Sequence, residues 1–146
     1  MLIKNLQQIE KNTFLNTCEY SSISASDILE LEQFCAAQDL DFLRVNLHQT
    51  NSSIVQQMIL VMRQNYEIKP HYQTFGHVSY NVLGGAASLS LFQKSGVYEE
   101  MKLSPDGINF IRLDRKIIRS MVALTRYFSF IETCNGPFRK QNTIWI

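Results

Sequence analysis

Cysteine, glycine and proline are all scarce in this chain of 146 residues, which contains 3 Cys, 6 Gly and 3 Pro. Cys18, Cys35 and Cys134 lie far apart, and none shares the short spacing of a zinc knuckle with another cysteine or with a histidine. The sequence therefore predicts neither a disulfide framework nor a structural zinc site. A chain of this length buries roughly 68 to 70% of its unfolded surface, so its apolar core alone can stabilise one domain.

An excess of charge of either sign is also missing, because 14 Lys and Arg residues nearly balance 13 Asp and Glu residues. This balance disfavours binding to nucleic acid or to an acidic membrane surface. No stretch is long and apolar enough to cross a membrane, and residues 1–14 lack the continuous apolar core of a signal peptide. We therefore expect a cytoplasmic protein with a single domain over residues 1–146 that contacts neither nucleic acid nor membrane.

One amphipathic helix is predicted near the N-terminus. Asp27 is suited to the N-cap position, with Glu30 reaching back from the third helical position of a capping box. The apolar positions that follow repeat at helical spacing, which predicts a helix over about residues 27–38. The preceding residues 1–23 are polar and are expected to be irregular, apart from an edge strand within 12–20.

From residue 42 onward the apolar positions recur about every second residue, which indicates β-strands. Gly84-Gly85, 94–96 and 105–107 supply the turn residues that tight hairpins need. Short strands at intervals of about ten residues predict an all-β jelly roll or closed barrel over 42–133, followed by a C-terminal tail at 134–146. The expected strands are 43–47, 54–62, 78–83, 86–92, 97–103, 108–113, 119–124 and 127–133.

Several short strings stand at defined places in this strand pattern. They are RVNLH at 44–48, VQQMIL at 55–60, KPH at 69–71, SYNVLGG at 79–85 and ETCNGPFR at 132–139. Together they resemble the WbuC-type cupins, small jelly-roll proteins associated with surface-polysaccharide biosynthesis. The last string is the most specific, because it joins a strand to a fixed turn and does not follow from alternation alone. The resemblance runs from about residue 20 to the end and implies a cupin barrel with one N-terminal amphipathic helix.

The same resemblance places the family's metal ligands on this chain. The family pattern has two histidines separated by one residue, then a glutamate, and a third histidine from a later strand. This set of ligands suits a divalent transition metal. Here His71 matches the first histidine, but Gln73, Val78 and Arg119 match the other three positions. An arginine has no lone pair to donate to a metal. We therefore expect no cofactor and a degenerate metal site.

His77 and Val78 are neighbours, so only one of them faces the barrel interior. Val78 shares a strand face with Tyr80 and Val82, which predicts that the apolar set points inward and His77 outward. If a divalent transition metal is bound nevertheless, the expected ligands are His71, Gln73 and either His48 or His77.

Two interpretations of Arg119 stay open. An inward guanidinium can hold a carboxylate or phosphate through two hydrogen bonds, as an acidic sugar or a nucleotide-sugar would require. Alternatively, Arg119 pairs with a carboxylate such as Asp114, or extends to the barrel mouth with its stem on apolar surface. His71 and Gln73 either bind a ligand or are satisfied internally. His48 either completes the pocket or belongs to an ordinary polar strand face.

The resemblance implies a protein of O-antigen or capsule biosynthesis that binds a small polar molecule, a sugar derivative or nucleotide-sugar, in the barrel without a full metal site. It also implies a homodimer, in which paired edge strands would be protected. The expected ligand-binding residues are His48, His71, Gln73, Tyr80 and Arg119. One alternative is a metal-dependent sugar isomerase, epimerase or oxygenase with a reduced ligand set. The other is a metal-independent sugar-modifying enzyme in which His71 or Tyr80 moves a proton.

Overall fold

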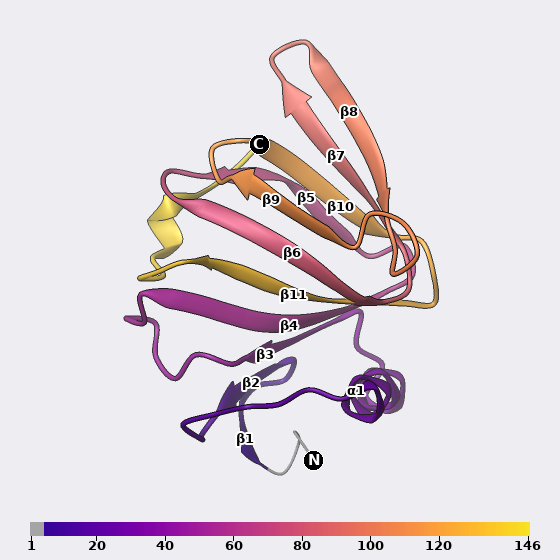
Figure 1. The fold of residues 1–146 in the computed structure, drawn as a ribbon, viewed down its shortest axis with the longest axis vertical. Coiled ribbons are helices and arrows are strands. Elements are labelled where there is room, and N and C mark those ends of the chain that lie inside the picture. Colours follow the sequence, from indigo (N-terminus) through magenta and orange to yellow (C-terminus); the bar gives the residue numbers. More distant parts are fainter. Residues whose placement is uncertain (1–4) are drawn as a thin grey trace.

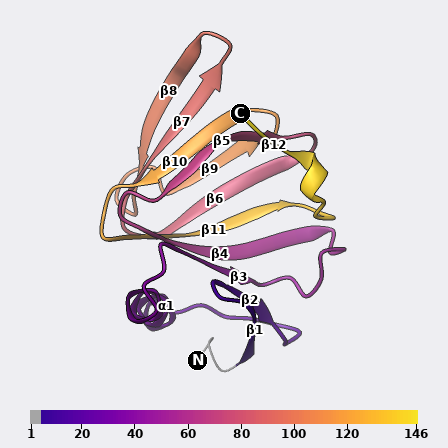
Figure 2. The ribbon, with the colours of Figure 1, turned by 180° about the vertical axis from the view of Figure 1, so that it is seen from behind.

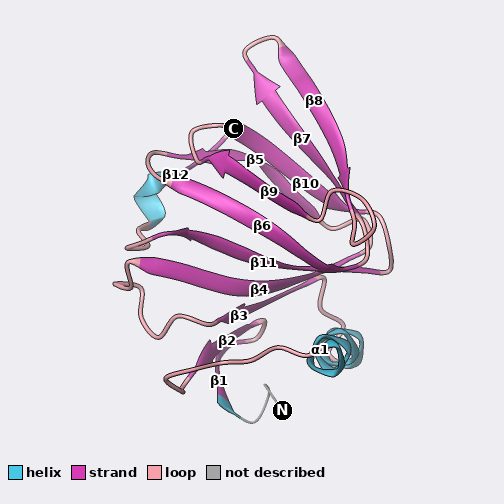
Figure 3. Cartoon of the chain, viewed as in Figure 1, coloured by secondary structure: helices cyan, strands magenta, loops and turns pink. Residues whose placement is uncertain are grey.

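The computed structural model describes residues 5–146, and strands dominate it, as Figure 3 shows. In chain order the elements are β1 (Leu6–Glu10), β2 (Thr13–Asn16), α1 (Ala25–Ala37), β3 (Phe42–Asn46), β4 (Val55–Arg63), β5 (Glu67–Gln73), β6 (His77–Gly84), β7 (Ala87–Gln93), β8 (Gly96–Leu103), β9 (Phe110–Asp114), β10 (Ile118–Ala123), β11 (Tyr127–Asn135), a short 3-10 helix (Lys140–Asn142) and β12 (Thr143–Trp145).

The strands form two sheets, drawn in Figure 1. One has seven strands in the order β1-β2-β3-β4-β11-β6-β9, and the other has five in the order β12-β5-β10-β7-β8. Strands that are neighbours in space are often distant in sequence, as in a jelly roll. The prediction of an all-β fold with one N-terminal helix is confirmed. No helix among residues 5–146 is long and apolar enough to cross a membrane.

The helix α1 begins earlier than the sequence predicts. Ser24, and not Asp27, is the N-cap residue. The Ser24 side chain accepts a hydrogen bond from the Asp27 amide at 3.2 Å, and the Asp27 carboxylate accepts one from the Ser24 amide at 2.8 Å. The prediction of a capping box by Asp27 and Glu30 is therefore wrong: Ser24 and Asp27 form the box, and Asp27 occupies its third helical position rather than the N-cap. Through Ile28, Leu31 and Cys35, α1 packs against β3 and β4.

Strand β4 is covered on both faces, as its nearly continuous apolar sequence predicts. Ile59 and Val61 pack with α1 on one face. Met58, Leu60 and Met62 point to the other face and join the large core between the two sheets. The same alternation in β3 turns Leu43 and Val45 toward α1. As a consequence, the intervening residues of β3 face the interior.

Both ends of the chain contain strands beyond those that the sequence predicts. The N-terminal segment forms β1 and β2 instead of one edge strand, and β2 lies inside the sheet because it pairs with both β1 and β3. The C-terminal tail contains β12, which pairs with β5 and brings Trp145 opposite His71 (Figure 2). Alternation does not predict β5 either, since Pro70 interrupts its apolar pattern. Of these additional strands, β5 and β12 contribute side chains to the wall of the interior.

The predicted turn at Gly84-Gly85 is present, and its backbone conformation explains why residue 85 is a glycine. Gly85 has a φ of +74°, and a Cβ atom there would lie 2.0 Å from the carbonyl oxygen of Tyr127. Only glycine fits both this backbone region and this close approach. The turn connects β6 to β7 and so carries the chain from one sheet to the other.

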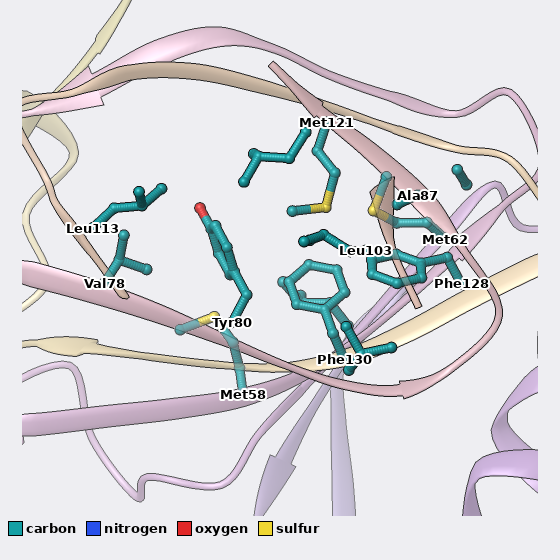
Figure 4. Packing of buried hydrophobic residues seen from close by; sticks show 14 of the residues in the cluster. Met58, Met62, Val78, Tyr80, Ala87, Leu103, Leu113, Met121, Phe128 and Phe130 are labelled. Carbon is teal, nitrogen blue, oxygen red and sulfur yellow. The ribbon is translucent and has the colours of Figure 1, made fainter. Parts of the chain in front are cut away.

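The main core fills one part of the space between the sheets. Figure 4 shows Phe128 and Phe130 beside Tyr80, Met121 and Leu103. The rings of Phe128 and Phe130 stack with centroids 5.1 Å apart, and Phe130 meets the edge of Tyr80 at 5.5 Å. The Tyr80 hydroxyl points away from the phenylalanines in Figure 4. Beyond it the interior becomes polar.

Candidate functional site

A cavity of about 840 Å³ occupies the polar part of the interior. It is lined by side chains from both sheets, among them His48, His71, Gln73 and Tyr80. The structure thus brings together four of the five residues that the sequence singles out as ligand-binding candidates. The fifth, Arg119, is not part of the lining.

The alternation of β6 places Val78 inside and His77 outside, as the sequence predicts. Val78 is buried in the core, whereas the His77 side chain is exposed and its backbone amide donates to the Asn135 side chain at 2.7 Å. The exposed His77 side chain is therefore not among the residues that line the cavity.

Arg119 lies behind the cavity wall and is only 1% exposed. Its Nε donates to the Tyr80 hydroxyl at 2.7 Å, and its Nη2 donates to Gln73 Oε1. Its Nη1 donates to the backbone carbonyls of Arg115 and Ile117, both at 3.2 Å. Every one of these acceptors is neutral. The expectation that Arg119 pairs with a carboxylate such as Asp114 or extends to the barrel mouth is therefore wrong, because the guanidinium is buried and satisfied by neutral oxygens.

The bonds of Arg119 fix the orientation of two lining side chains. Gln73 Oε1 accepts from Arg119, which leaves the amide hydrogens of Gln73 free to donate to another group. Tyr80 also accepts from Arg119, so its own hydroxyl hydrogen can donate elsewhere. Because Gln73 and Tyr80 line the cavity, Arg119 turns them into hydrogen-bond donors for a molecule inside it.

His71 is held as a neutral imidazole. Its Nδ1 lies 2.9 Å from the Lys69 carbonyl, so Nδ1 carries the hydrogen and Nε2 keeps its lone pair. Burial, and then the charge of Arg119, lower the pKa of His71 to about 4. Its ring lies 4.8 Å from that of Trp145, which is 61% exposed and also lines the cavity. The Nε2 atom of His71 is therefore available as a hydrogen-bond acceptor beside the ring of Trp145.

Two further titratable groups of the wall, Tyr80 and Cys134, are also in their neutral forms. Burial raises the pKa of the Tyr80 hydroxyl to about 12, and burial together with the charge of Glu132 raises that of the Cys134 thiol to about 11. A thiol that stays protonated is a poor nucleophile. Cys134 is therefore a small apolar part of the wall.

The residues at the positions that the WbuC resemblance assigns to metal ligands do not fit a transition metal. Only His71 supplies an imidazole, and the cationic guanidinium of Arg119 lies where the third histidine is expected. His48, the other donor considered, has its Nδ1 3.0 Å from the Gln57 carbonyl. Among residues 5–146, no three His, Cys, Asp or Glu side chains are grouped so that they could hold a metal ion. The donor set is that of a hydrogen-bonding pocket.

Arg44 and Arg115 also line the cavity, and the sequence analysis does not single them out for this role. Arg44 lies on the inward face of β3, and Arg115 follows β9 and is 6% exposed. The signal for Arg44 was its place two residues before Asn46 and four before His48, which share its strand face. Arg115 had no comparable signal, because the residues between strands have no fixed direction in an alternating pattern.

Comparison with known proteins supports the fold. No protein-family model and no curated protein sequence matches the chain. Among solved structures, the chain is similar to a cupin superfamily protein from Desulfitobacterium hafniense, with 17% identity, a TM-score of 0.53, and coverage of 64% of this chain and 76% of that one. The chain has a cupin fold. A second neighbour is KdgF from Halomonas sp., with 18% identity, a TM-score of 0.56 and coverage of 69% and 84%.

A third neighbour is CapF, a capsular polysaccharide assembling protein from Staphylococcus aureus. It shares 12% identity with a TM-score of 0.59, and the match covers 72% of this chain but only 31% of CapF. The cupin fold therefore corresponds to less than a third of that protein. At these identities the similarity concerns the fold alone.

Proposed function

We propose that this cytoplasmic protein binds a small polar, sugar-derived molecule in its cupin cavity without a metal ion, as part of surface-polysaccharide biosynthesis. One observation carries the proposal: the guanidinium of Arg119, which the resemblance aligns with the third histidine, is buried and donates to Gln73 and Tyr80. A fixed cation there opposes a divalent cation and orients donors toward a ligand.

The rest of the cavity supports a sugar. Gln73 and Tyr80 offer donors, His71 offers an acceptor, and the exposed ring of Trp145 offers a flat apolar surface. A sugar ring has hydroxyl groups for the first three and a C–H face for the last. A volume of about 840 Å³ falls in the usual range for small-molecule sites. The fold similarity to CapF agrees with the polysaccharide setting that the WbuC resemblance implies.

The test combines metal analysis with a ligand screen. Protein purified without an affinity tag or added metal is analysed for transition metals, and its melting temperature is measured with a panel of neutral sugars, sugar phosphates, uronates and nucleotide-sugars. We expect less than stoichiometric metal and a raised melting temperature with at least one compound. Stoichiometric metal that is lost in His71→Ala would instead favour the metal-dependent isomerase, epimerase or oxygenase.

Binding ranks ahead of metal-independent catalysis because of the protonation states. A general acid or base works best with a pKa near the working pH. The pKa values of His71 and Tyr80 lie at about 4 and about 12, on opposite sides of neutrality. His71→Gln and Tyr80→Phe are therefore expected to weaken ligand binding; a reaction of a bound sugar that both variants abolish would favour the enzyme.

We also propose a homodimer formed through β8. This strand is an edge of the five-stranded sheet, and it is exposed along most of its length, including Val97 and Tyr98. A long exposed edge strand tends to pair with another copy. Light scattering on the purified protein should give twice the chain mass, and Val97→Lys should reduce it to one chain. A monomeric wild-type protein would contradict the dimer.

A further inference from the structure

Two arginines of the cavity wall carry buried nitrogen atoms without a hydrogen-bond partner. Arg115 donates from Nη1 to the Asn135 carbonyl at 2.9 Å, and its guanidinium lies 5.4 Å from the centre of the Phe75 ring. The guanidinium of Arg44 lies 5.6 Å from the centre of the Phe42 ring. In both arginines Nε is buried and unpartnered. The aromatic rings fix the two planar groups but leave these donors unused.

Such unpaired donors are rare in this molecule. Within the described part of the chain, buried side-chain atoms without a partner are found at Glu30, Arg44 and Arg115, and the two arginines line the same cavity. Neither forms an ion pair in residues 5–146, where the recorded pairs join Arg63 to Asp39 and Asp41. An unsatisfied buried donor destabilises the folded protein, and more so when it carries a charge. An anion in the cavity beside the two guanidiniums would offset that destabilisation through its opposite charge.

The charges of the wall favour an anion. The cationic side chains Arg44, Lys69, Arg115 and Lys140 outnumber the carboxylates Glu67 and Glu132. Arg119 adds a further buried positive charge behind Gln73 and Tyr80. Burial, and then the charge of Glu132, raise the pKa of the Cys134 thiol, whereas the charges of Arg115, Arg119 and Arg44 act to lower it. All three guanidiniums therefore act on Cys134, which lines the cavity.

Building on the proposed function, we propose that the ligand is an anionic sugar derivative, whose carboxylate or phosphate accepts hydrogen bonds from Arg44 and Arg115. The sugar ring then lies toward Trp145, and its hydroxyl groups meet Gln73 and Tyr80. Arg119 contributes indirectly, because it orients Gln73 and Tyr80 but does not itself line the cavity. The anion site is thus built by residues from β3 and from the segment between β9 and β10.

The chain provides its own probe, since Trp145 is its single tryptophan and lines the cavity. Tryptophan fluorescence is titrated with glucuronate, glucose 1-phosphate and glucose. Glucuronate has a carboxylate in place of the C6 hydroxymethyl group of glucose, and glucose 1-phosphate has a phosphate on the anomeric oxygen. The comparison therefore distinguishes a carboxylate ligand from a phosphate ligand. We expect at least one anion to bind about tenfold more tightly than glucose and to weaken as ionic strength rises.

Variants then assign the binding to the two arginines. Arg115→Gln and Arg44→Gln are each expected to lower the affinity for the anion by about tenfold or more. The affinity for glucose should stay nearly unchanged. Arg112→Gln removes an exposed arginine of β9 that does not line the cavity, and it serves as the matched control. Because Arg115 is buried, the folding of the Arg115→Gln protein is checked by circular dichroism. Arg44 is half-buried and provides the independent second variant.

The outcomes separate this inference from the proposed function. If glucose or another neutral sugar binds as tightly as both anions, the anion site is wrong and the sugar-binding function stands. Folded Arg44→Gln and Arg115→Gln proteins that bind the anion like the wild type would overturn the assignment to these residues. If neither anion binds at about 10 mM, the inference fails, since even a weak specific site has a Kd near the millimolar range. If no neutral sugar binds either, the proposed sugar-binding function fails as well.

Discussion

The barrel interior has an apolar half and a polar half, which share strands but differ in chemistry. Along β11 the inward side chains change from Phe128 and Phe130 to Glu132. Along β10 they change from Met121 to Arg119. The apolar half gains stability from every group it buries. The polar half buries groups that need partners, and its wall leaves some of them unpaired.

This difference separates the part of the molecule that holds the fold from the part that holds a ligand. An apolar filling of the polar half would be compatible with the same two sheets. Instead, Arg119, with 1% exposure, is the largest of the fully buried side chains. Buried polar groups of this kind are retained where they position something else, here the donors of Gln73 and Tyr80. Perturbing each half in turn tests this division.

The largest loss of stability is expected in the apolar half. Phe130→Ala removes a side chain with 0% exposure that contacts both Phe128 and Tyr80. The cavity it leaves should lower the free energy of unfolding by about 3–5 kcal/mol. Denaturant unfolding measures this loss. Phe110→Ala, at an exposed position of β9, is the control and should change stability little; equal losses for both would show that the core has been placed wrongly.

The next effect belongs to the polar half and depends on pH. His71 has a pKa of about 4 in the folded protein, below the ordinary value of 6.5. The unfolded chain therefore binds a proton first as the pH falls, so stability is complete above about pH 6.5 and declines toward pH 4 by about 3 kcal/mol. His71→Gln should flatten this decline in denaturant unfolding at several pH values. His77→Gln, which alters an exposed histidine, should retain it.

Arg119→Lys tests whether the polar half depends on charge alone or on hydrogen-bond geometry. A lysine keeps the positive charge but cannot reach the four acceptors that surround the guanidinium fork. We expect a loss of about 2–3 kcal/mol in the free energy of unfolding, because buried acceptors are left without donors. Arg112→Lys, on the surface, is the control. If both lysine variants are equally stable, the hydrogen-bond network does not support the fold.

The same contrast explains how far the sequence could be read. Alternation predicts most strands and the inward direction of Val78, because burial of apolar side chains leaves a period of two. It does not predict β5, where Pro70 and polar residues break the pattern, or β12, whose three residues are too few to show one. β5 and β12 both contribute to the cavity, whereas β1, which is also not predicted, lies outside it. The polar half is therefore the harder half to predict from the sequence.

The site itself was predictable only in part, for a related reason. Motif position identifies His71, Gln73 and Arg119 as a group, and the structure does bring Gln73 and Arg119 into contact. Position along a strand cannot tell whether a long side chain reaches the cavity or stops behind its wall. Arg119 lies behind the wall, whereas Arg115, from outside the predicted strands, lines the cavity. That distinction depends on the packing of both sheets.

The smallest effect is expected at Tyr80, which joins the two halves. Tyr80→Phe keeps the ring against Phe130 and removes only the hydroxyl that accepts from Arg119. We expect a loss of about 1–2 kcal/mol, with Tyr20→Phe at an exposed position as the control. In the Arg119→Lys background the hydroxyl has already lost its donor, so the same change should cost less there. Strictly additive losses in this double-mutant cycle would mean that Tyr80 belongs to the apolar half alone.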